Sequence, residues 1–193
     1  PELRERLRLV PRPEAVVFDF EPGAMDYCFC ERCRKGFAAS AGLKAVPDAA
    51  EIRAKHSAEW FQFRVVQHAR LVETYNRCMR KHFPDVPFWI CTDPLHASGG
   101  ILSEWCGCDE RLFDPHVAGH MPMPYYAGLR FFQDVALNVK TLKKPVFPLI
   151  DPAEQLEEFF KRYTPAQVKQ NVVAAAAVGC VGFGFWPGDN LDG

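Results

Sequence analysis

Short apolar runs alternate with longer amphipathic stretches along this chain. The runs have the length of buried strands, and the stretches between them carry apolar side chains at the spacing of helices. We expect five strands, which cover residues 15–21, 87–92, 117–123, 145–150 and 180–186. Buried strands that alternate with helices favour an α/β fold with a parallel sheet.

The helical stretches have recognisable ends. We expect one helix from about Cys33 to Ala41, closed by Gly42, and a long helix over 49–83 that Pro84 ends. A helix over 127–142 follows the third strand. The last helix starts at Thr164-Pro165-Ala166-Gln167, which has the pattern of a capping box, and stops at Gly179. The other expected elements are the end of a helix at 2–9 and a short helix near 109–113 within a poorly patterned connection.

The number of strands and the length together suggest a partial barrel. A (β/α)8 barrel usually takes about 250 residues, whereas this chain has 193. We therefore predict that residues 1–193 form a single α/β domain, the C-terminal part of a TIM-type barrel with about strands four to eight, which continues N-terminally in the full protein. An open doubly wound sheet is the alternative, and it is disfavoured because no glycine-rich phosphate loop follows any strand.

Charge and hydropathy narrow the range of partners. The chain has 23 basic and 24 acidic side chains and a formal net charge of -1, so we expect it to bind neither nucleic acid nor an anionic membrane. It has no apolar run of membrane-spanning length, and its first residues lack the apolar core of a signal peptide. Because it does not begin with Met, we expect residues upstream and assign no location. A homo-oligomer is left open.

Two acids mark the end of the first predicted strand. Side chains alternate between the faces of a strand, so Asp19 and Glu21 share one face while Val16, Phe18 and Phe20 share the other. Ligands of α/β barrels and open sheets bind outside the carboxyl ends of the strands, so these acids indicate an active site. The alternative is an ordinary strand whose last acids begin a solvated loop.

Parallel strands would gather further polar and aromatic side chains at the same end of the sheet. Carboxylates hydrogen-bond sugar hydroxyls and aromatic rings pack on sugar faces, so this combination predicts a carbohydrate site. Glu21 is the candidate general acid, because a neighbouring Asp19 disfavours a second negative charge and keeps a proton on the pair. The candidate substrate-binding residues are Asp93, Tyr125, Tyr126, Trp186 and Asp189.

Three short motifs resemble the chitinase-like family 18 glycoside hydrolases. They are Asp19-Phe20-Glu21, Met121-Pro122-Met123-Pro124-Tyr125 and Gly182-Phe183-Gly184-Phe185-Trp186. The resemblance implies that Glu21 is the acid and Asp19 its partner, that Tyr125 positions the substrate and that Trp186 forms the floor of a sugar subsite. We expect the glycines before Trp186 to leave space beneath it.

Cys28, Cys30 and Cys33 follow soon after Glu21, and this spacing is similar to that of family 42 β-galactosidases and related barrel enzymes. The resemblance implies a structural zinc bound by these cysteines. Zinc takes four ligands, of which this stretch offers three, and Cys106 or Cys108 could supply the fourth. The alternative is a group of free thiols in a reducing compartment. The same resemblance implies a carboxylate nucleophile at the end of strand seven, where this chain has Asp151.

The sequence thus predicts a glycoside hydrolase-like domain with Glu21 as general acid and base, Asp19 beside it and Asp151 as a further catalytic candidate. No cofactor is needed for that chemistry. The alternative is a non-catalytic carbohydrate-binding or scaffold barrel with a structural zinc. A metal-dependent hydrolase is disfavoured, because the chain lacks the His-x-His and His-Glu-x-x-His patterns.

Overall fold

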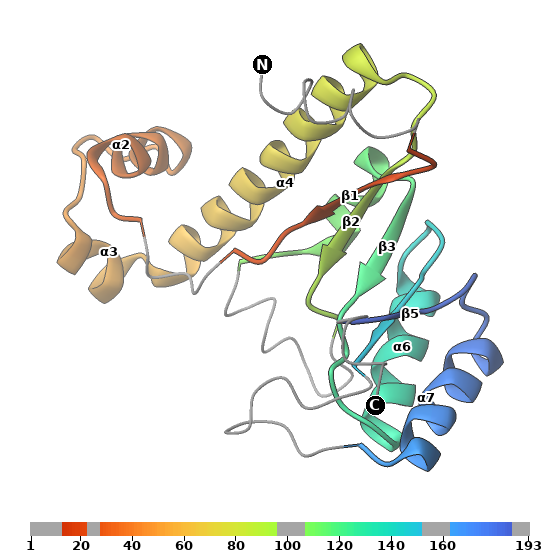
Figure 1. The fold of residues 1–193 in the computed structure, drawn as a ribbon. Coiled ribbons are helices and arrows are strands. Elements are labelled where there is room, and N and C mark those ends of the chain that lie inside the picture. The colour runs from red at the N-terminus through yellow and green to blue at the C-terminus, as the bar shows by residue number, and fades with distance from the viewer. Residues whose placement is uncertain (1–12, 23–27, 96–106, 152–162, 187–193) are drawn as a thin grey trace.

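The described strands form two parallel sheets, one with the order β1-β2-β3, whose strands Figure 1 shows side by side, and one that pairs β4 with β5. The computed structural model describes residues 13–22, 28–95, 107–151 and 163–186. β1 pairs with β2, β2 with β3, and β4 with β5. A parallel bridge between His120 and Val146 joins the two groups. The strands are β1 (Val16–Asp19), β2 (Phe88–Thr92), β3 (Gly119–Pro122), β4 (Leu149–Ile150) and β5 (Gly184–Phe185).

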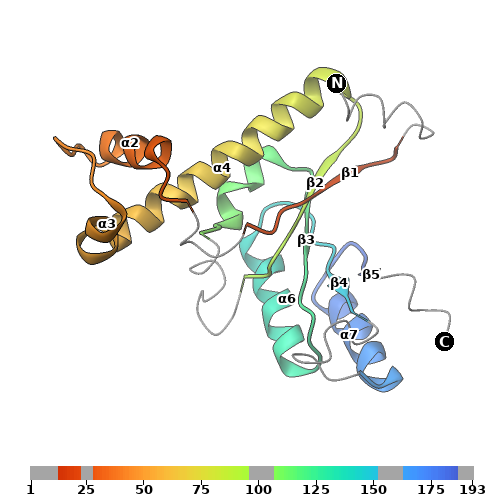
Figure 2. The ribbon, with the colours of Figure 1, turned by 60° about the vertical axis from the view of Figure 1, so that its left-hand side comes forward.

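Helices fill the connections between these strands. They are α2 (Glu31–Ser40), α3 (Ala49–Lys55), α4 (Ser57–His82), α6 (Leu129–Thr141) and α7 (Pro165–Ala177), with two short 3-10 helices, η1 (Glu110–Leu112) and η2 (Asp114–His116). The predicted capping box of α7 is confirmed, since Thr164 and Gln167 each accept a backbone N–H bond from the other. Figures 1 and 2 show α4 alongside β1 and β2, and α2 with α3 at the end of α4 that lies away from the sheet.

One face of the sheet is covered by helices. Val72 and Met79 of α4 pack with Phe88 and Ile90 of β2 and with Phe20 in one apolar cluster. A second cluster joins α6 and α7 to the last two strands through Phe131, Val135, Ala175 and Ile150. Burial of these side chains is the main favourable term for holding the helices on the sheet.

The opposite face of the sheet is packed by its own side chains. The ring of Trp89 in β2 lies over Gly119 of the next strand, and it meets Phe147 edge to face at 6.5 Å between centroids. Phe147 in turn covers Gly182 and Gly184. The space expected beneath Trp186 is therefore filled, because a large ring on one strand takes the volume that glycines leave on its neighbour.

The structure corrects the expected long helix. α3 ends at Lys55, His56 leaves helical geometry with φ −131° and ψ 26°, and α4 begins at Ser57. The break turns α3 so that Ile52 is buried against Phe37 and Trp60. Neither proline nor glycine marks this position, so tertiary packing and not a local sequence signal divides the helix.

The remaining elements lie close to their expected positions. The strands are shorter than the apolar runs that predict them, and the short helix near 109–113 is two 3-10 turns. The expected helix at 2–9, Cys106 and Asp189 lie outside the described residues. In the described part of the chain, no helix combines the length and the apolar character that crossing a bilayer requires.

Gly119→Ala should lower the free energy of unfolding by about 1–3 kcal/mol, the usual cost of overfilling a packed core. The added Cβ would lie 2.2 Å from Cζ3 of Trp89, well inside van der Waals contact. Urea denaturation measures the change. The same substitution in a Trp89→Leu background should cost much less, and equal costs in the two backgrounds would show that the ring is not what excludes a side chain there.

Candidate functional site

Three acids converge at the carboxyl ends of β1 and β2. Asp19 ends β1 and is in register with Cys91 of β2, while Glu21 and Asp93 each follow two residues later on the same face. Phe20 between the first two acids is buried with the helix-side core, whereas Asp19 and Glu21 are exposed. The strand alternation predicted for these acids is therefore confirmed.

The acids influence one another electrostatically. Burial raises the pKa of Glu21, and the negative charges of Asp19 and Asp93 raise it further. The thiol of Cys91 is influenced by the same negative charges. Burial raises its pKa most, and the charges of Asp19, Glu21 and Asp93 raise it further, to about 12. Glu21 thus holds its proton to a higher pH than an isolated glutamate.

Tyr125 and Asp151 extend this group across the sheet. Tyr125 packs with Cys91, Met123 and Leu149 on the face opposite the helices. Burial raises the pKa of its phenol, and nearby Cys91, Glu21, Asp19 and Asp151 raise it further. Asp151 directly follows β4 and is only 3% exposed. We call Asp19, Glu21, Asp93 and Asp151 the acidic mouth.

Trp186 lies at the same end of the last strand pair. Ile150 pairs with Phe185, and the backbone N–H of Trp186 donates to the Ile150 carbonyl oxygen at 3.0 Å. The next residues along, Asp151 and Trp186, are therefore neighbours across β4 and β5. The indole is 49% exposed, so its face is accessible beside the acidic mouth.

Tyr126, another predicted substrate-binding residue, packs towards the helices. Its hydroxyl donates to a carboxylate oxygen of Asp134 in α6, and the Arg130 guanidinium lies 4.2 Å from its ring centroid. Burial and this hydrogen bond raise the pKa of the Tyr126 phenol. Tyr125 and Tyr126 therefore lie on different sides of the sheet.

Glu110 is a buried acid that the sequence reasoning missed. It begins η1, is 3% exposed, and its Oε2 atom has no hydrogen-bond partner among the residues that the structure describes. The neighbouring Arg111 is held by Asp109 through two bonds of 2.7 Å. Burial is the main reason that the pKa of Glu110 rises to about 8, with the charges of Asp109 and Asp93 adding to it. Nothing in its local sequence signals this burial.

Two buried asparagines on the helices hold the loops that follow the strands. Asn138 of α6 accepts from the backbone N–H of Leu95 at 3.3 Å and donates to its carbonyl oxygen at 3.1 Å. Asn171 of α7 donates to the Tyr126 carbonyl oxygen and accepts from Gly128 N–H. Each asparagine interrupts the apolar stripe of its helix, and this sequence signal could have identified both residues.

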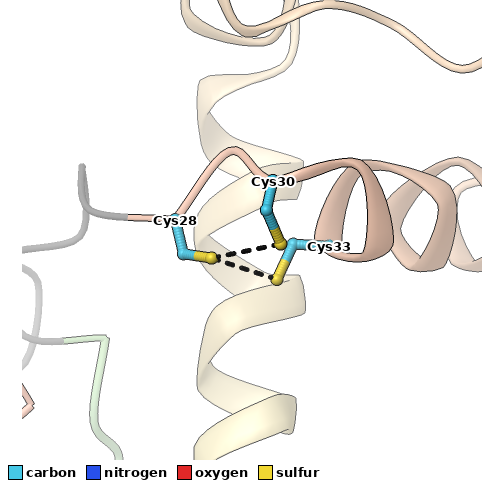
Figure 3. Close-up of side chains that lie close together, drawn as sticks. All are labelled: Cys28, Cys30 and Cys33. Atoms are coloured by element: carbon cyan, nitrogen blue, oxygen red, sulfur yellow. Dashed lines mark hydrogen bonds between the residues drawn. The ribbon is translucent and has the colours of Figure 1, made fainter.

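Cys28, Cys30 and Cys33 come together where the chain enters α2 (Figure 3). The Sγ atom of Cys28 lies 3.4 Å from that of Cys30 and 3.5 Å from that of Cys33. Cys30 is the N-cap residue of α2, and hydrogen bonds led by the one from the Cys33 backbone lower its pKa to about 7. Cys108 is buried beside His68 instead, with its sulfur 3.8 Å from Nδ1 of that histidine.

The geometry of the three thiols fits a tetrahedral metal ion. Zn–S bonds of about 2.3 Å require sulfur atoms about 3.8 Å apart, close to the spacings found here. Among the described residues, no fourth His, Cys, Asp or Glu joins the cluster.

Comparison with known proteins identifies the fold of the chain. Neither a protein-family model nor a curated protein matches the chain in sequence. Among solved structures, the glycoside hydrolase domain of PgaB (BpsB) from Bordetella bronchiseptica is similar over 97% of this chain and 56% of its own, with a TM-score of 0.69 and 15% identity. The chain has a glycoside hydrolase-like fold.

Two further structures agree. The β-galactosidase from Rahnella sp. R3 is similar over 95% of this chain and 32% of its own, with a TM-score of 0.63 and 15% identity. Bee venom hyaluronidase is similar over 97% of this chain and 68% of its own, with a TM-score of 0.57 and 12% identity. The chain spans about half the length of the PgaB domain and a third of the β-galactosidase.

Glu110→Gln should make stability less dependent on pH. Because the pKa of Glu110 rises from 4.5 to about 8 on folding, the folded protein keeps a proton that the unfolded chain loses between these values. Its contribution is complete below about pH 4.5 and is lost as the pH rises towards 8. At pH 8 we expect the variant to be more stable by a few kcal/mol, on the order that such a shift implies.

Urea denaturation from pH 5 to pH 8 measures this effect. Glu59→Gln, at an exposed position on α4, is the control for the loss of one negative charge. Identical slopes of stability against pH in the parent and in Glu110→Gln would contradict the expectation.

Proposed function

We propose that this chain forms about strands four to eight of a (β/α)8-type barrel and hydrolyses a glycosidic bond at the acidic mouth. Glu21 is the general acid and base, and Asp19 is its partner. The observation that carries the proposal is the convergence of Asp19, Glu21 and Asp93, which together with burial raises the pKa of Glu21. The glycoside hydrolase-like fold supports it, since the carboxyl ends of the strands are where barrel enzymes bind their substrates.

The proposed chemistry follows from the two states of one carboxyl group. Protonated Glu21 donates its proton to the glycosidic oxygen as the bond to the leaving sugar breaks. As that bond breaks, a carboxylate nucleophile, for which Asp151 is the candidate, bonds to the sugar carbon. The Glu21 carboxylate then takes a proton from the water that displaces this nucleophile, which returns both groups to their starting states. Asp19 favours the protonated form before the reaction, and its charge stabilises the positive character that develops on the sugar ring.

The remaining acids and rings are proposed to bind the sugar. The charge of Asp93 acts on Glu21, the charge of Glu21 acts on the phenol of Tyr125, and the half-exposed Trp186 lies beside Asp151. A sugar binds such a site through hydroxyl hydrogen bonds and through stacking of its apolar face. Asp151 is the candidate nucleophile if the reaction retains configuration. Asp189 stays a substrate-binding prediction from the sequence.

We also propose that Cys28, Cys30 and Cys33 hold a structural zinc with one further ligand. The thiol spacing supports this, since zinc binds sulfur ligands at about this separation. Zinc would tie the start of α2 to the segment that follows β1. It takes no part in the proposed hydrolysis.

Glu21→Gln should reduce kcat by about 10²–10⁴-fold, the usual contribution of general acid–base catalysis. Hydrolysis of a panel of 4-nitrophenyl glycosides and natural oligosaccharides measures it, with isothermal titration calorimetry for binding. Binding of a glycan by the variant without turnover supports the catalytic role. Glycan binding without hydrolysis by the parent would favour the non-catalytic carbohydrate-binding alternative and overturn the enzyme proposal.

Asp19→Asn should move the alkaline limb of the activity profile to lower pH. The charge of Asp19 raises the pKa of Glu21, so its removal makes Glu21 lose its proton earlier. The readout is kcat/KM against pH for any glycoside that the parent hydrolyses. An unchanged alkaline limb would show that Glu21 is not the acid that this limb reports.

The zinc proposal predicts about one equivalent of bound zinc in the purified protein. Cys28→Ser and Cys33→Ser should each lower that content, and a chelator should lower the melting temperature of the parent. Cys78→Ser removes an exposed thiol of α4 and should leave the zinc content unchanged. Parent protein free of zinc after expression in zinc-supplemented medium would contradict the proposal.

A further inference from the structure

The loop that carries Tyr125 is held mainly by hydrogen bonds from side chains of other segments. Its own backbone bonds are short-range, from Tyr125 N–H to the Met123 carbonyl oxygen at 2.9 Å and from Tyr126 N–H to that of Pro124 at 2.8 Å. Bonds that span two residues close tight turns of the γ type. They leave the carbonyl oxygens of Tyr125 and Tyr126 available to other partners.

Two side chains, from Tyr163 just before α7 and from Asn171 in the middle of that helix, bond those carbonyl oxygens. The hydroxyl of Tyr163 donates to the Tyr125 carbonyl oxygen at 2.8 Å. The Asn171 carboxamide donates to the Tyr126 carbonyl oxygen at 3.0 Å and accepts from the N–H of Gly128 at 3.4 Å. Asn171 is 2% exposed, so its carboxamide has little water to bond in their place.

The geometry of Gly128 shows why this support is needed. Its φ of 78° lies in the left-handed region, and it is the N-cap residue of α6 without a capping side chain. The carboxamide oxygen of Asn171 receives the N–H of this glycine just before α6 begins. One side chain thus fixes both the end of the tyrosine pair and the start of the helix.

Tyr126 is anchored on the helix side by Asp134 and Arg130. With that ring fixed, the neighbouring Tyr125 packs on the opposite face with Cys91, Met123 and Leu149, where the charges of nearby acids raise the pKa of its phenol in addition to burial. The direction of Tyr125 therefore depends on the backbone between the two tyrosines, which is the part that Tyr163 and Asn171 bond.

We infer that Tyr163 and Asn171 are positioning residues that aim the Tyr125 hydroxyl into the acidic mouth. Each acts through the backbone of the tyrosine pair, to which its side chain donates a hydrogen bond. The inference rests on the proposed function only in assigning Tyr125 to the glycan. A displacement of about 1 Å in a positioned group can cost on the order of 10²-fold in rate, so such residues matter for turnover.

A measurement without substrate tests the positioning itself. Protein labelled with ¹³C at the tyrosine Cζ gives one signal per tyrosine, and Tyr125→Phe identifies that of Tyr125. An ordinary tyrosine has a pKa near 10, whereas burial and the neighbouring acids raise the pKa of Tyr125. We expect its signal in the parent to keep its protonated position at pH 10.5, and to move downfield by that pH in Tyr163→Phe and Asn171→Ala.

Asn138→Ala is the matched control, because Asn138 is similarly buried but bonds the backbone of Leu95 and Asp134 and not that of the tyrosine pair. We expect it to lower stability without shifting the Tyr125 signal. Tyr163→Phe removes a single hydroxyl and keeps the ring. It therefore tests the inference even if Asn171→Ala does not fold. A Tyr125 titration unchanged from the parent in both variants would overturn the inference.

Turnover supplies a second test through a double-mutant cycle. With a 4-nitrophenyl glycoside that the parent hydrolyses, we expect Tyr163→Phe to lower kcat about 10-fold and to have less than a twofold effect in a Tyr125→Phe background. Equal losses in both backgrounds would show that Tyr163 does not act through Tyr125. If the parent hydrolyses none of the panel, the hydrolase proposal fails, and the ¹³C titration still decides the positioning.

Discussion

The in-register parallel pairing of β1, β2 and β3 determines which side chains form the candidate site. Phe18, Ile90 and His120 are aligned across the three strands and point to the helices, while Asp19, Cys91 and Met121 are aligned on the opposite face. A shift of one residue in any strand would exchange its two faces. The helix-side core would then receive a carboxylate in place of a phenyl ring, at a large cost in desolvation. Burial of the apolar face thus fixes the position of the acids.

Buried polar groups on the helix side fix the relative positions of neighbouring segments through directional hydrogen bonds, which apolar packing does not provide. Asp114 accepts from Nε2 of His120 at 3.0 Å and from the backbone N–H groups of Lys143 and Lys144 at 3.0 and 3.2 Å. One carboxylate thus connects η2, β3 and the turn that leads into β4. Burial lowers the pKa of His120 more than Asp114 raises it, so the imidazole stays neutral and donates from Nε2. These bonds fix the position of β3 relative to the turn that leads into β4.

Much of this arrangement follows from the sequence, since period-two alternation is a strong signal in short apolar runs. It separated Asp19 and Glu21 from Phe18 and Phe20, and the Thr164 capping box marked the start of α7 within a residue. Contacts between distant segments were not predictable in this way. The break at His56 depends on Ile52 reaching Phe37, and the filling of the space at Gly182 depends on Phe147 in the segment just before β4. Each requires knowing which elements meet.

The electrostatic character of the site is therefore a property of the sheet more than of its loops. Asp19 raises the pKa of Glu21, of Cys91 and of Tyr125, because the strand register places all of them on one face near one end. The loops determine the direction in which individual side chains point. Buried side chains of the helices, such as Asn138 and Asn171, hold these loops in place. The strands therefore set the proton affinity of the acids, while side chains on the helices set the orientation of Tyr125. A substitution can change one of these properties without the other. A substitution in α7 can redirect Tyr125 while Glu21, Asp19 and Asp93 keep their mutual positions on β1 and β2.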